Sequence, residues 1–179
     1  MKSLCIFCGS SPGNDRVLIQ EIKKLMAFLA QENWSVVYGG ASVGIMGLVA
    51  DEALKNNMKV TGVLPKNFQQ KEIAHAGLSK LILVDTMHER KFKMYELSDA
   101  FLVLPGGLGT LDELFEITTW KQIGFHKKPI GIWNYQGYYD SLLKFLEHSK
   151  EKGFVPQQLS GLLIANKDYE ALIRGFINI

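Results

Sequence analysis

The sequence A-F-L-V-L-P-G-G-L-G-T at residues 100–110 contains the pattern that decides the fold. Residues 100–104 are apolar throughout, which is typical of a strand buried on both faces of a parallel sheet. Pro105 and the glycines after it end this strand, and the spacing of apolar residues at 110–123 predicts a helix. A buried strand, a glycine-rich turn and a helix therefore follow one another.

The same alternation of short apolar runs and helical patterns extends along the 179 residues of the chain. Strand–helix alternation with short connections predicts an α/β fold: one doubly wound, Rossmann-like domain over residues 1–179, with a mostly parallel sheet flanked by helices. We expect strands at residues 3–8, 35–38, 59–64, 81–84, 100–104, 130–133 and 162–165, helices near 17–29, 44–57, 87–97, 110–123, 138–150 and 169–176, and an irregular loop or short helix at 66–79.

Composition and charge exclude several classes of partner. The formal net charge is only +2 and the lysines are scattered, whereas a nucleic-acid binder usually has a basic face. No apolar run approaches the roughly 18 residues that a membrane helix needs, and the apolar run before Gly9 is too short for a signal peptide. We therefore expect a cytoplasmic protein that binds neither nucleic acid nor membrane.

Three predicted strands end in small residues, at positions 9–11, 39–44 and 106–110. The carboxyl ends of parallel strands share one edge of the sheet, where ligands of doubly wound folds bind. Glycines there let backbone N–H groups approach an anion, and the following helix adds unpaired N–H groups. The three clusters together predict a phosphate site. Close packing of helix on strand is the alternative explanation for the second cluster, which fits no dinucleotide fingerprint.

The third cluster is followed by polar side chains that could bind the anion or react beside it. We expect Thr110 to cap the helix and to offer its hydroxyl to the same anion. Asp112 and Glu113 then fall in the first helical turn, where a carboxylate either complements the helix dipole or lies beside the phosphate as a reactive group.

The cysteines and histidines predict no metal site. Cys5 and Cys8 lie three residues apart on a predicted strand, so their side chains point to opposite faces of the sheet. We expect them to be two buried thiols of the core. The four histidines show no spacing typical of metal ligands. We expect neither a metal nor a cofactor.

Four blocks of sequence resemble one known family in the same order. They are F-C-G-S-S at 7–11, Y-G-G-A-S-V-G-I-M-G at 38–47, M-H-E-R-K at 87–91 and P-G-G-L-G-T-L-D-E at 105–113. The last block matches the pattern P-G-G-x-G-T-x-x-E of the LOG family, the cytokinin riboside 5′-monophosphate phosphoribohydrolases, whose members are often labelled lysine decarboxylases. The resemblance extends over essentially the whole chain.

The resemblance implies hydrolysis of a purine nucleoside 5′-monophosphate to free base and ribose 5-phosphate by a homodimer without a cofactor. Matching positions make Arg90 and Glu113 the catalytic residues. The matching substrate-binding residues are Glu72, Lys91, Gly106, Gly107, Leu108, Gly109, Thr110 and Thr119. Of these, Glu72 lies in a stretch without a motif of its own.

The roles fit the chemistry of N-glycoside cleavage, which builds positive charge on the ribose ring. The carboxylate of Glu113 suits the stabilisation of that charge and the activation of water, while Arg90 suits binding of oxygens or orientation of Glu113. Two simpler interpretations remain: Arg90 forms a surface ion pair with Glu89 or Glu96, and Glu113 merely complements the helix dipole.

Other functions stay open at this stage. The alternative to the hydrolase is a nucleotide- or cofactor-binding or sensing protein on the same fold, without chemistry. A true lysine decarboxylase needs pyridoxal phosphate on a lysine, for which we find no motif. Met87, Met94 and Tyr95 line either a base pocket or a plain core or dimer interface.

Overall fold

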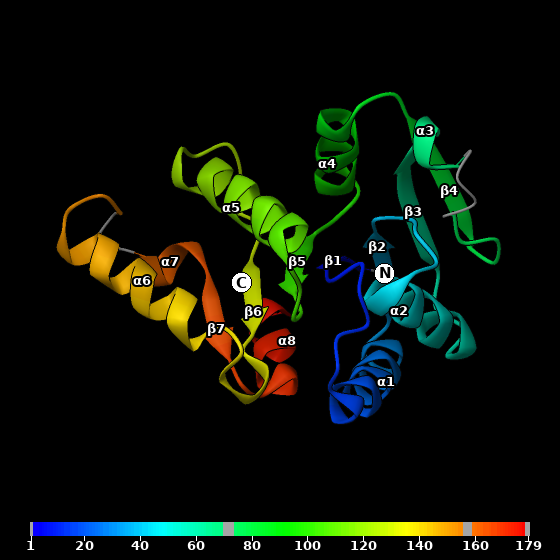
Figure 1. Cartoon of the computed structure of the whole chain (residues 1–179), viewed down its shortest axis with the longest axis horizontal. Helices are drawn as coiled ribbons and strands as arrows, with labels where there is room; N and C mark the ends of the chain where they lie inside the picture. Colours follow the sequence, from blue (N-terminus) through cyan, green and yellow to red (C-terminus); the bar gives the residue numbers. More distant parts are fainter. Residues whose placement is uncertain (1, 70–73, 156–158, 178–179) are drawn as a thin grey trace.

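A parallel sheet forms the centre of the computed structural model, which describes residues 2–69, 74–155 and 159–177 (Figure 1). Within these residues seven strands pair in the order β4-β3-β2-β1-β5-β6-β7, and all the pairs are parallel. This confirms the predicted α/β fold. The strands are β1 (Lys2–Phe7), β2 (Trp34–Tyr38), β3 (Val60–Pro65), β4 (Lys80–Val84), β5 (Ala100–Val103), β6 (Ile130–Trp133) and β7 (Ile164–Asn166).

Helices cover both faces of the sheet. Helices α1, α2 and α8 pack in one core layer, and α4, α5 and α6 pack in the other (Figure 1). The helical segments are α1 (Arg16–Gln31), α2 (Gly44–Lys55), α3 (Lys66–Gln69), α4 (Met87–Glu96), α5 (Leu108–Gln122), the 3₁₀ turn η1 (Tyr135–Gly137), α6 (Asp140–Glu151), α7 (Leu159–Leu162) and α8 (Tyr169–Ile177). Among the described residues, no helix has the length and apolar character needed to cross a membrane.

Alternation along β1 explains why residues 4–7 are all apolar. Leu4 and Ile6 belong to the core layer of α1, α2 and α8, whereas Cys5 and Phe7 belong to the layer of α4, α5 and α6. Cys8 lies in the first layer, so the two thiols are buried on opposite faces and are free of disulfides, as predicted.

The strand order places the switch point of the fold between β1 and β5. From β1 the chain adds β2, β3 and β4 outward on one side, and β5 then returns to the other side of β1. The loops that leave the carboxyl ends of β1 and β5 consequently diverge and open a crevice, where ligands of doubly wound folds bind.

Most element bounds differ from the predicted ones by one or two residues, and three of the differences are informative. Helix α5 begins at Leu108 rather than at residue 110, because Gly107 takes the extended N-cap conformation. The last strand is Ile164–Asn166, and Leu162 belongs to α7 instead. The helix expected from residue 138 begins at Asp140, because a 3₁₀ turn with Gln136 at φ 48° precedes it.

Candidate active site

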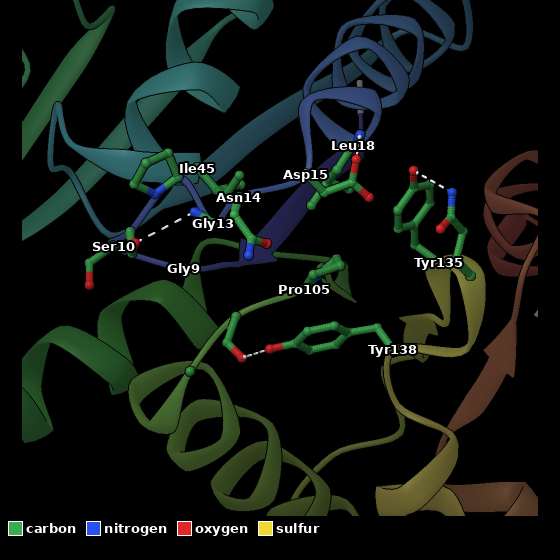
Figure 2. A pocket seen from close by; sticks show the side chains of 15 residues that line it. Gly9, Ser10, Gly13, Asn14, Asp15, Leu18, Ile45, Pro105, Tyr135 and Tyr138 are labelled. Atoms are coloured by element: carbon green, nitrogen blue, oxygen red, sulfur yellow. Dashed lines mark hydrogen bonds between the residues drawn. The ribbon is translucent and has the colours of Figure 1, made fainter.

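Two cavities open at the switch point, one on each side of the loop that follows β5. The smaller cavity, about 170 Å³, contains Arg90 and Glu113 together with the first turn of α5. The larger cavity, about 550 Å³, lies between the loop after β1 and the turn that carries Tyr135 and Tyr138 (Figure 2). Both cavities include Ser10 and Gly107 in their lining, so the loop after β5 separates them.

The N-terminus of α5 faces the smaller cavity without a side-chain cap. Its N-cap is Gly107, and in the described part of the chain no side chain accepts a hydrogen bond there. By contrast, Asp15 caps α1 and Thr86 caps α4 with side-chain oxygens. An uncapped helix start carries free N–H groups and a partial positive charge, which suits an anion such as phosphate.

Thr110 does not cap α5, contrary to the sequence-based expectation. The helix already includes Leu108 and Gly109, so Thr110 lies in its first turn, 3% exposed, and lines the smaller cavity. Asp112 and Glu113 therefore lie beyond the first four residues of the helix. Glu113 is therefore not placed to complement the helix dipole, because the effect of the dipole fades after the first turn.

A buried ion pair joins α4 to α5 in the smaller cavity. Arg90 Nη1 donates to Glu113 Oε1 at 2.7 Å, and the two residues are only 8% and 9% exposed. The alternative prediction, a surface ion pair of Arg90 with Glu89 or Glu96, is therefore wrong. Glu89 instead accepts from the backbone N–H of Asp85, while Glu96 pairs with Lys93.

The backbone of the neighbouring strands fixes the guanidinium of Arg90. Its Nε donates to the carbonyl of Val63 at 3.1 Å. A Cβ at Gly39, at the end of β2, would collide with Nη2 of Arg90. The second glycine cluster thus leaves room for the arginine, besides the close packing that its other glycines provide: Gly44, at φ 61°, brings α2 onto the backbone of Ser10.

Electrostatics set the protonation of two groups in the smaller cavity. Burial raises the pKa of Glu113 above its ordinary value, and the adjacent Arg90 opposes this without cancelling it. Burial and the charge of Glu113 also raise the pKa of the Cys8 thiol. Cys8 therefore lines the cavity as an uncharged thiol, which is unsuited to act as a nucleophile.

Lys91 and Thr119 do not line the smaller cavity, and Gly106 lines the larger one. Lys91 pairs with Asp112 and Glu116, each at 3.1 Å. Burial lowers the pKa of Lys91, but hydrogen bonds to Glu116 and Asp112 outweigh burial and raise it. Thr119 is exposed on the outer face of α5. Glu72 lies outside the described residues.

The three side chains considered for a base pocket, Met87, Met94 and Tyr95, do not line the smaller cavity. Met94 is buried in the core, and Tyr95 contacts Trp120 with ring centroids 5.4 Å apart. Met87, by contrast, is 44% exposed at the start of α4. The core interpretation is therefore confirmed for Met94 and for Tyr95, which packs against the same core layer.

Two tyrosines that the sequence does not single out contact the loop after β5. Tyr138 donates to the carbonyl of Gly106, and Tyr139 donates to the carbonyl of Leu104. Neither belongs to a recognisable motif, yet both follow the carboxyl end of β6. The parallel order of the strands is therefore the signal that points to them.

Metal ligands do not cluster at this site. Across the described residues, no group of three or more His, Cys, Asp or Glu side chains is arranged to hold a metal ion. The chemistry available in the smaller cavity is that of a buried carboxylate, a guanidinium and the backbone N–H groups of a helix start.

Comparisons with known sequences identify the relatives of this chain. Residues 46–176 match the protein family described as "Possible lysine decarboxylase". A cytokinin riboside 5′-monophosphate phosphoribohydrolase of Arabidopsis thaliana is 39% identical over 173 residues, which cover 97% of this chain and 81% of that protein. Another protein of this name, from Rhodococcoides fascians, is 42% identical over 173 residues, covering 96% of this chain and 87% of that protein.

Solved structures with a similar fold include proteins that bind or carry the molybdenum cofactor. The molybdenum cofactor binding protein of Rippkaea orientalis has a TM-score of 0.70 at 20% identity, and the match covers 99% of this chain and 98% of that one. The Moco carrier protein of Chlamydomonas reinhardtii has a TM-score of 0.73 at 16% identity, with the same coverage. At such identities the likeness shows the shared fold alone.

Proposed function

This chain belongs to the LOG family, whose general description is possible lysine decarboxylase, and from this premise we propose that it hydrolyses purine riboside 5′-monophosphates. Water would attack C1′ of the ribose, and the C1′–N bond would break with its electrons leaving on the base. The products would be the free base, which takes up a proton, and ribose 5-phosphate. The observation that carries the proposal is the buried pair of Arg90 and Glu113 beside the uncapped start of α5.

The phosphate end of the substrate would bind at residues 106–110. The free N–H groups in the first turn of α5 suit its charge, and Thr110 lines the same cavity. Fixing the phosphate holds the ribose at one distance from Glu113, which lies one turn further along the helix. Such positioning accounts for a large part of the rate that an enzyme gains.

Glu113 would act on the reacting carbon. An ionised carboxylate stabilises the positive charge that develops on the ribose and orients or deprotonates the attacking water. Arg90 holds one carboxylate oxygen at 2.7 Å and opposes the effect of burial, so that it favours the ionised form. A carboxylate beside an anion repels it, so a protein that only binds nucleotides would gain nothing from Glu113.

We propose that Glu72, Lys91 and Thr119 make further contacts with the substrate. Thr119 lies on the same exposed face of α5 as Phe115, away from the smaller cavity of its own chain. Large apolar side chains near this face are exposed: Phe92 by 42%, Phe115 by 39% and Ile123 by 69%. We propose that this α4–α5 surface, defined by Phe92, Phe115 and Ile123, forms a homodimer interface that brings Thr119 towards the partner's site.

Lysine decarboxylation is poorly supported by the same geometry. A pyridoxal phosphate enzyme holds its cofactor through a lysine. Among the described residues, no lysine lines either of the two cavities at the switch point. Lys91 lines only a space of about 10 Å³, which has no room for a cofactor.

Product analysis tests the proposal directly. We would incubate the protein with AMP, with N6-isopentenyl-AMP and with each matching nucleoside that lacks the phosphate, and quantify base and ribose 5-phosphate by chromatography. We expect release from at least one nucleotide and very little from its nucleoside. Nucleotide binding without release of any base would support the carrier or sensor function. Release of cadaverine from lysine would support the decarboxylase.

A further inference from the structure

The connection between β6 and α6 contacts the loop after β5 from the side of the larger cavity. Tyr138 Oη donates to the carbonyl oxygen of Gly106 at 2.8 Å, and Tyr139 Oη donates to that of Leu104 at 2.7 Å. Figure 2 shows the ring of Tyr138 pointing from its turn towards the loop that follows Pro105. The two hydroxyls therefore bind carbonyls just before the first turn of α5.

The hydrogen bond of Tyr138 determines where one N–H group points. The Gly106 carbonyl and the Gly107 N–H belong to a single peptide unit, and the described chain contains no cis peptide bond. In a planar trans peptide the C=O and N–H groups point in opposite directions. Because Tyr138 holds the carbonyl of Gly106 on its own side of the loop, the N–H of Gly107 points away from Tyr138, and Gly107 also lines the smaller cavity.

Tyr139 has a different role, although it makes a similar bond. The carbonyl of Leu104 is followed by Pro105, which has no N–H to orient. Tyr139 is 3% exposed and packs in the core, and burial raises the pKa of its phenol, so it stays a donor. It anchors the end of β5, whereas Tyr138, which is 56% exposed, contributes little to the core.

We propose that Tyr138 is a positioning residue for the phosphate site, which orients the Gly107 N–H towards the bound anion through the Gly106 carbonyl. The proposal rests on the function above in taking this anion to be the 5′-phosphate of the substrate. Tyr138 touches neither the reacting carbon nor Glu113. Its loss weakens binding of the phosphate in the ground state and the transition state alike.

Tyr138→Phe tests this inference, because it removes only the hydroxyl. Tyr135→Phe is the matched control: Tyr135 lines the same cavity, but its hydroxyl accepts from Gln136 and lies beside Asp15, away from Gly106. We would measure the affinity for inorganic phosphate and ribose 5-phosphate by calorimetry, together with KM, kcat and the melting temperature.

We expect Tyr138→Phe to weaken phosphate binding and to raise KM about three- to tenfold, the loss of roughly one hydrogen bond, with kcat and melting temperature nearly unchanged. Unchanged phosphate affinity, an equal loss in Tyr135→Phe, or no phosphate binding by the unsubstituted protein would overturn the inference. Phosphate binding that depends on Tyr138, in a protein that releases no base, would retain the inference and reject the hydrolase.

Discussion

The carboxyl group of Glu113 experiences two opposing effects at the scale of the single residue. Burial disfavours its charge, while Arg90 favours it, and the balance leaves its pKa above the ordinary value of 4.5. A base must be ionised to accept a proton. Activity that depends on ionised Glu113 is therefore present above this raised pKa and lost as the pH falls through it.

We accordingly predict an acid limb in the pH profile of kcat/KM, with a midpoint above 4.5. The phosphate of the substrate also titrates with a pKa of about 6. The profile of the residual activity of Glu113→Gln serves as the control, because only the phosphate limb should persist there. An identical acid limb in both proteins would show that Glu113 does not produce it.

Arg90 is expected to matter for both stability and activity. Arg90→Ala leaves Glu113 buried without its cation, so we predict a loss of about 3–5 kcal/mol in the free energy of unfolding and a loss of turnover of about 100-fold or more. Lys93→Ala, in the same helix, breaks the exposed pair with Glu96 and should cost under about 1 kcal/mol without loss of turnover. Similar mild effects of both substitutions, measured by denaturation and product release, would contradict the role of Arg90.

At the scale of the element, the end of β2 is shaped around a side chain from α4. The Cβ in Gly39→Ala would meet the far end of Arg90, which moves more readily than backbone. We predict a loss of turnover of about tenfold or more, from the misplaced guanidinium, with a loss in unfolding free energy of under about 2 kcal/mol. Gly175→Ala in α8 meets no atom within 4 Å and serves as the control. Full turnover in Gly39→Ala would show that the fit around Arg90 does not matter.

The sequence predicts the elements better than it predicts their ends. Apolar runs predict all the described strands, the buried central ones as well as the more exposed edge strands β4 and β7, and β6 matches its predicted bounds of 130–133. The sequence predicts the start of α5 two residues late, because Thr110 offers a side-chain oxygen for capping and glycine has none. At this helix the cap is left open, which is what an anion site requires.

At the scale of the whole molecule, parallel topology explains why three separate glycine clusters could be assigned to one site. The carboxyl ends of β1, β2 and β5 lie next to one another in the sheet, so residues near 9, 39 and 106 meet. The pairing of Arg90 with Glu113 was not predictable from spacing, because it depends on how α4 and α5 pack. The contact of Tyr138 with Gly106 depends on the path of a loop, which follows no periodic pattern.

The proposed homodimer makes a separate prediction. Phe115→Lys places a charge on the α4–α5 surface, so we expect a monomer by light scattering and a lower turnover if the partner's Thr119 completes the site. Phe154→Lys changes a residue that is 85% exposed just after α6 and should leave both unchanged. A Phe115→Lys protein that stays dimeric would place the interface elsewhere, and a monomeric unsubstituted protein would reject the dimer.

The most direct test of the central claim compares binding and turnover in Glu113→Gln. The substitution keeps the size of the side chain and an oxygen that accepts from Arg90, but it removes the charge that hydrolysis needs. Calorimetry with the nucleotide that the unsubstituted protein cleaves fastest, followed by quantification of free base, gives both quantities. We predict equal or tighter binding, with turnover lower by about 100-fold or more. Turnover close to that of the unsubstituted protein would contradict the assignment of Glu113 as the catalytic carboxylate.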